Sequence, residues 1–64
     1  MRETEFWERM TLTLGDTYAA FWAGQTTLAD LGGRTPGDAL ASGVPPREVW
    51  RAVHRFLELP ASER

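Results

Sequence analysis

The strongest constraint on this chain is that it is very short and has no covalent cross-link: it has 64 residues and no cysteine. A domain of this size buries only about 60% of the surface that its unfolded chain exposes. Without a disulfide, a hydrophobic core must supply the stability. The sequence offers the material, since 42% of its residues are hydrophobic. We therefore predict one helical domain over residues 1–64, with the aromatic rings in its core: Phe6, Trp7, Tyr18, Phe21, Trp22, Trp50 and Phe56.

Apolar residues recur at helical spacing through the first half of the chain. They predict a helix over about 4–14, with Thr4 as its N-cap. A similar period runs on after Asp16, which favours one long helix over about 16–31 with Asp16 as its cap. The weak helix formers Gly24, Thr26 and Thr27 leave open that this helix is broken there. The apolar stripe of the first helix is Phe6, Met10 and Leu14.

The second half contains two further helix signals. Thr35, followed by a proline, is typical of an N-cap and the first helical position, and predicts a short helix over about 35–42. The second of two adjacent prolines opens a helix over about 46–58. With Gly43 in the turn, the two helices resemble a helix-turn-helix. The predicted class is all-α: a small single-domain bundle of three to four helices, the last two arranged as a helix-turn-helix-like pair, with residues 61–64 expected to fray.

Common catalytic and ligand-binding signatures are missing from the sequence. It has no nucleophile elbow, no phosphate-binding loop and no His-Glu-x-x-His motif. The single histidine, His54, has no second histidine or cysteine to complete a metal site, and is expected to pair with Glu58 four residues on. We therefore expect no catalytic residue, no metal site and no cofactor.

Targeting signals are missing as well. No apolar run reaches the roughly 18–20 residues of a membrane span, and the first residues lack the apolar region of a secretory signal. We expect a cytoplasmic protein that does not bind membranes.

Three arginines, spaced four residues apart, form a stripe on the predicted last helix. They are Arg47, Arg51 and Arg55. Because the chain as a whole has a net charge of -2, this stripe is a local reversal of sign. Such a surface is typical of contact with anions, either phosphates or an acidic partner helix. The alternative is a solvated helix face on which Glu48 pairs with Arg51 and Arg55 pairs with Glu58.

Several longer stretches, spread over the whole chain, carry a resemblance to known sequences. They are Met1-Arg2-Glu3-Thr4-Glu5-Phe6-Trp7, Leu31-Gly32-Gly33-Arg34-Thr35, the turn with Ala39-Leu40 and Gly43-Val44, Val49-Trp50-Arg51-Ala52-Val53 and the closing Leu57-Glu58-Leu59-Pro60-Ala61-Ser62-Glu63-Arg64. Together they resemble a family of short actinobacterial proteins of unknown function. Members of that family are commonly encoded beside the main recombinase and its regulatory protein, and this neighbourhood implies a link to DNA recombination or repair. The resemblance implies no catalytic or binding residues.

Two functional hypotheses follow. The first is a non-enzymatic adaptor that binds a protein partner and exposes an apolar patch of several hundred Å²; self-association stays open. The second is a helix-turn-helix-like DNA-binding module that uses Arg47, Arg51 and Arg55, whose affinity falls steeply with salt. An enzyme would instead need convergent polar groups in a pocket.

Overall fold

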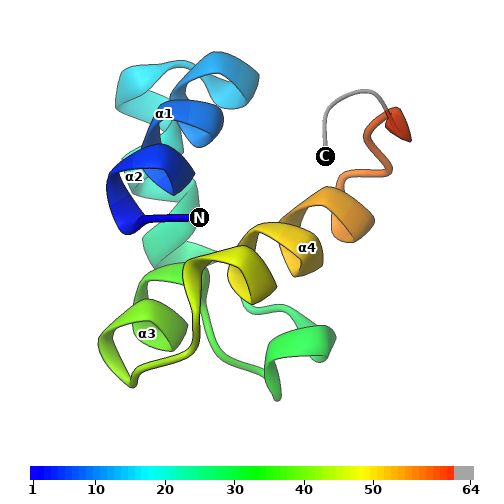
Figure 1. Ribbon diagram of the computed structural model, residues 1–64. Coiled ribbons are helices and arrows are strands. Elements are labelled where there is room, and N and C mark those ends of the chain that lie inside the picture. The colour runs from blue at the N-terminus through cyan, green and yellow to red at the C-terminus, as the bar shows by residue number, and fades with distance from the viewer. Residues whose placement is uncertain (62–64) are drawn as a thin grey trace.

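The chain folds into helices, as its apolar periodicity predicts, and the all-α class is confirmed (Figure 1). The computed structural model describes residues 1–61, so most of the tail expected to fray lies outside the described residues. The elements are α1 (Glu3–Leu14), α2 (Asp16–Gln25), the short 3₁₀ helix η1 (Ala29–Leu31), α3 (Pro36–Ala41) and α4 (Pro46–Phe56).

A single residue, Gly15, joins α1 to α2. Its φ of 88° and ψ of 150° lie in a region that glycine alone adopts readily, and the turn folds α2 back against α1 (Figure 1). The predicted cap at Thr4 is wrong, because the helix already begins at Glu3 and no side chain caps it. Asp16 is the first residue of α2 rather than its cap, and its carboxylate accepts the N–H of Thr17 at 2.7 Å.

The predicted continuous helix over 16–31 is wrong. The helix ends at Gln25, and Thr26 is extended, with φ -95° and ψ 119°. The β-branched threonines that follow Gln25 favour this extended backbone over a helix. Leu28 then forms an isolated antiparallel bridge with Arg34, its N–H donating to the Arg34 carbonyl at 3.0 Å. Leu28 and Leu31 still stand at the spacing of helical core residues, because both are buried in the same core, Leu31 from within η1.

The caps of the last two helices follow the sequence more closely. The Thr35 hydroxyl accepts the N–H of Asp38 at 3.1 Å, which confirms the predicted N-cap of α3. Gly43 then turns the chain with a φ of 97°, and α4 packs against α3. The last helix ends at residue 56, two residues before the predicted end. That this pair works as a helix-turn-helix stays a prediction, as does the assignment of the chain to one domain.

The core lies where α1, α2 and α4 meet, and all five elements contribute to it. Its buried apolar side chains are Phe6, Met10, Ala19, Trp22, Ala23, Leu28, Leu31, Ala39, Val49, Trp50, Ala52 and Val53.

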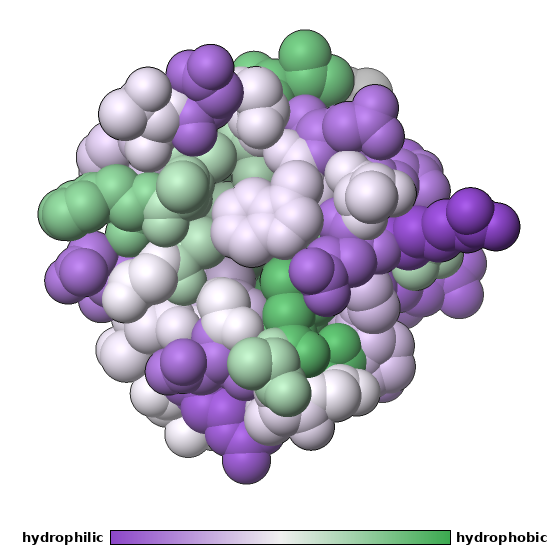
Figure 2. All heavy atoms as spheres, turned by 90° about the vertical axis from the view of Figure 1, so that its left-hand side faces the viewer, coloured by the Kyte–Doolittle hydropathy of each residue, from purple (hydrophilic) through white to green (hydrophobic). Residues whose placement is uncertain are grey.

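Three aromatic side chains predicted for the core are on the surface instead. Tyr18, Phe21 and Phe56 keep 54%, 62% and 53% of their surface exposed. Helices this short cannot enclose every ring of a small chain, so part of its apolar surface reaches solvent. Figure 2 shows one face of the protein, on which apolar side chains reach the surface in patches between hydrophilic ones.

Candidate functional site

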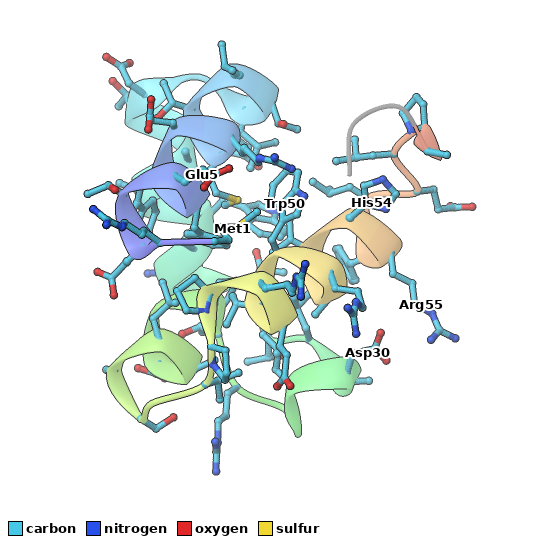
Figure 3. All side chains as sticks on the ribbon, viewed as in Figure 1. Met1, Glu5, Asp30, Trp50, His54 and Arg55 are labelled. Carbon is cyan, nitrogen blue, oxygen red and sulfur yellow. The ribbon has the colours of Figure 1, made fainter. Side chains whose placement is uncertain are left out.

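A hollow of about 460 Å³ opens between the start of α1 and the exposed side of α4. In Figure 3, Met1 and Glu5 approach it from the α1 side and Trp50 and His54 from the α4 side. Its lining residues are Met1, Glu5, Arg9, Arg47, Trp50, Arg51 and His54. The hollow exists because both helices place residues four apart on the same side, so each helix contributes a short row of side chains.

The indole ring of Trp50 forms the floor of the hollow. Only 4% of Trp50 is exposed, and Phe6 supports it from the core, with ring centroids 6.3 Å apart in an edge-to-face arrangement. The Cζ atom of Arg9 lies 6.0 Å from the centre of the ring, at the outer limit of a cation–π contact. The His54 ring meets the indole edge to face at 6.4 Å. The Trp50 ring is therefore held in place by Phe6 on the core side and by Arg9 and His54 on the side of the hollow.

The indole nitrogen of Trp50 is unusual for a buried polar atom. Within residues 1–61, its N–H has no hydrogen-bond partner. Leaving a buried donor unpaired costs about 1–3 kcal/mol. A tryptophan at this position therefore carries a cost that a phenylalanine would avoid.

Positive charge dominates the rim. The guanidinium of Arg9 pairs with Glu5 at 3.4 Å, which uses the only carboxylate that lines the hollow within the described residues. Arg47 and Arg51 are exposed, and no carboxylate oxygen of residues 1–61 lies within 4 Å of either. Three guanidiniums thus face one carboxylate, and two of them are available to an anion.

The third arginine of the predicted stripe lies elsewhere. Arg55, with 82% of its side chain exposed, is 3.7 Å from the carboxylate of Asp30 in η1. Figure 3 shows this pair on the other side of α4 from Trp50 and His54. Residues four apart drift by about 40° around a helix, so the row turns away from the hollow over two steps.

The charge pairs predicted along α4 do not form among the described residues. Arg51 has no acidic partner there, and Arg55 pairs with Asp30 rather than with Glu58. The pairing of His54 with Glu58 is also wrong: the Nε2 atom of His54 lies 2.9 Å from the Pro60 carbonyl, so this contact holds the chain after α4 against the helix.

The sequence predicts two of the three arginines that line the hollow, Arg47 and Arg51, and does not single out Arg9. Arg9 and Glu5 carry a visible signal, because an acid and a base four residues apart form a helix-surface pair. Nothing local to that pair indicates that it faces α4. The predicted core position of Trp50 is confirmed. That its ring also forms the floor of the hollow follows only from the packing of α1 against α4.

The described part of the chain lacks two other features that would point to a function. Among residues 1–61, no three histidine or carboxylate side chains gather closely enough to hold a metal ion. No helix over this range combines the length and apolar character needed to cross a membrane.

Comparison with known proteins gives a family and no activity. A family model described as "Protein of unknown function (DUF3046)" matches residues 1–62. The chain matches no curated protein and no solved structure.

Proposed function

We propose that this chain, which belongs to the family of proteins of unknown function whose model covers residues 1–62, is a non-enzymatic adaptor. It binds an acidic segment of a protein partner in the hollow between α1 and α4. One observation carries the proposal. Arg9 from α1 and Arg47 and Arg51 from α4 converge around the Trp50 ring, in a chain whose net charge is -2.

The chemistry of these groups fits carboxylates carried on a peptide. A guanidinium presents two parallel N–H donors that match the two oxygens of a carboxylate. The small part of the Trp50 ring that reaches the hollow offers an apolar contact for a methylene group of Glu. A volume of about 460 Å³ accommodates a few side chains, which suits a short segment better than a whole domain.

The partner that we propose belongs to DNA recombination or repair in the cytoplasm. This part of the proposal rests on the resemblance described above, whose members are commonly encoded beside the main recombinase and its regulatory protein. The chain would then act on a protein of that machinery rather than on DNA itself.

A DNA-binding module is the alternative, and one observation favours it. Arg47, Arg51 and Arg55 are all exposed on α4, the second helix of the pair that resembles a helix-turn-helix. Recognition helices place such side chains against phosphates and base edges. The two hypotheses differ over Arg55, which a DNA surface along α4 would use and the hollow does not.

Fluorescence anisotropy tests both hypotheses with the same protein. The probes are a labelled acidic peptide of Glu and Gly and a labelled random DNA duplex, each titrated at low and at physiological salt. We expect the peptide to bind and Arg51→Gln to weaken it about tenfold or more, because a charge-assisted hydrogen bond is worth about 1.5–3 kcal/mol. Arg55→Gln is the matched control on the same helix and should change peptide affinity by less than about twofold.

The outcomes separate the hypotheses. Duplex binding that falls with salt and is weakened equally by Arg51→Gln and Arg55→Gln would favour the DNA-binding module. Binding of neither probe at low salt would refute both.

A further inference from the structure

Glu5 is the acidic side chain that lines the hollow within residues 1–61. It stands on α1 one helical turn before Arg9, and its Oε2 atom lies 3.4 Å from the guanidinium of that residue. Figure 3 shows Glu5 on the side of α1 that faces Trp50. A carboxylate held by a guanidinium is also the contact proposed for the bound acidic segment. The hollow therefore already contains one group with the same chemistry as its ligand.

We propose, on the basis of the proposed function of this hollow, that Glu5 is a built-in competitor of the acidic segment. Its carboxylate holds Arg9 and repels the carboxylates of a ligand until one of them takes its place on Arg9. Arg47 and Arg51 have no acidic partner within residues 1–61, so they are free to meet the ligand first. A further carboxylate is then needed to displace Glu5. The competition thus favours segments with several acidic residues over a segment with one.

The alternative role for Glu5 is to position Arg9 for the ligand. A carboxylate does so when it holds a guanidinium from the side that faces away from the ligand. Glu5 instead lines the same hollow that the ligand enters, and 49% of its side chain is exposed. Like charges that share one hollow repel each other. The two roles predict opposite signs: loss of the Glu5 charge strengthens binding if Glu5 competes and weakens it if Glu5 positions Arg9.

The pair between Glu5 and Arg9 can open at little cost to the fold. Both side chains are partly exposed, and the contact between them is a single long one. Exposed pairs four residues apart on a helix contribute little to stability. A ligand carboxylate can therefore replace Glu5 without disturbing α1. For the same reason Glu5→Gln should leave the fold intact, so that a change in its binding reports on the hollow.

Anisotropy titrations with the labelled peptide of Glu and Gly test the proposal on the full chain. At low salt, Glu5→Gln should tighten binding by roughly three- to tenfold, since a unit charge a few Å from another contributes about that factor in water. The gain should shrink as salt screens the charges. Glu8→Gln is the matched control, because it makes the same change of charge on the same helix at a residue that does not line the hollow. It should change the affinity by less than about twofold. Circular dichroism checks that both variants fold.

Arg9→Gln separates competition for Arg9 from a general effect of charge. It is made alone and together with Glu5→Gln, and the peptide is titrated against both proteins. In the wild type, the ligand gains Arg9 only by breaking the contact with Glu5, so Arg9→Gln removes the difference between the two contacts. In the Glu5→Gln background it removes the whole contact with the ligand. Arg9→Gln should therefore weaken binding by a larger factor in the Glu5→Gln background than in the wild type.

The same titrations distinguish failure of this role of Glu5 from failure of the proposed function. If the wild type binds the peptide and Glu5→Gln binds it no more tightly than Glu8→Gln, Glu5 is not a competitor, although the hollow keeps its ligand. Weaker binding by Glu5→Gln would overturn competition in favour of positioning. Equal losses from Arg9→Gln in the two backgrounds would overturn competition for Arg9. A peptide bound neither by the wild type nor by Glu5→Gln would refute the proposed function and the competitor with it.

Discussion

Glu58 offers a direct test of how backbone geometry ends the last helix. Its φ of 53° is the one left-handed value at a non-glycine residue within residues 1–61. The N–H of Leu59 donates to the carbonyl of His54 at 3.1 Å, and the N–H of Glu58 donates to that of Arg55 at 3.2 Å. These two bonds are the pattern of a Schellman helix end, in which the left-handed position is usually glycine. We predict that Glu58→Gly stabilises the protein.

The expected gain follows from two opposing terms. A left-handed backbone costs a residue with a side chain roughly 1–2 kcal/mol, and glycine removes that cost. Glycine also gives the unfolded chain more freedom, which takes back about 0.5–1 kcal/mol. The net gain is about 0.5–1 kcal/mol, which corresponds to a rise in Tm of roughly 2–8 °C for a domain of this size.

Gly43 provides the matched control, because it ends α3 in the same way. It has a φ of 97°, and the N–H of Val44 donates to the carbonyl of Ala39 at 3.0 Å. Gly43→Ala should therefore lower Tm by a similar amount.

The negative charge of Glu58 near the end of a helix is a second possible source of any gain, and Glu58→Gln isolates it. Thermal unfolding followed by circular dichroism measures all three variants. A Glu58→Gly variant no more stable than Glu58→Gln would refute the backbone argument.

Three further substitutions test the core, a cap and a surface ion pair by the same unfolding assay. Phe6→Ala, at a fully buried position, should cost about 3–5 kcal/mol, whereas Leu12→Ala at an exposed one should stay within about 0.5 kcal/mol; similar losses would contradict the assigned core. Thr35→Ala should cost about 1 kcal/mol through loss of the α3 cap, and no loss would mean that the cap bond does not form in solution. Arg55→Gln should change the free energy of unfolding by less than about 0.5 kcal/mol, since its pair with Asp30 is exposed; a larger loss would show that the pair holds η1 to α4.

Local signals in the sequence predicted the helices that have strong ends. Thr35 with the proline after it marks the start of α3, and both the cap bond and the helix follow. The region after Gln25 shows where such signals fail. Leu28 and Leu31 keep a helical spacing because both enter the core, yet the chain between Gln25 and Leu28 is extended. Periodicity records which side chains are buried, and a bridge followed by a 3₁₀ helix buries them as well as a continuous helix does.

The aromatic residues and the hollow show a limit of a different kind. Composition indicates that rings favour the core, but it does not say how many of them a 64-residue fold can enclose, and Tyr18, Phe21 and Phe56 remained outside. The hollow depends on the contact between α1 and α4, which joins Arg9 to Arg51 across more than forty residues of sequence. Spacing along α4 predicts the row of Arg47, Arg51 and Arg55. Only the packing between helices determines that Arg47 and Arg51 line the hollow while Arg55 pairs with Asp30.

Stability and the proposed binding are coupled through Trp50. Its ring packs against Phe6 on the core side and contacts Arg9 and His54 on the side of the hollow, so one side chain belongs to both. A ligand that binds only the folded state raises its stability in proportion to the logarithm of ligand concentration above Kd. An acidic peptide that occupies the hollow should therefore raise Tm. A substitution of Phe6, which supports the Trp50 ring from the core, should weaken peptide binding although Phe6 does not line the hollow. In so small a protein the partner then supplies part of the stability that a larger core would otherwise provide.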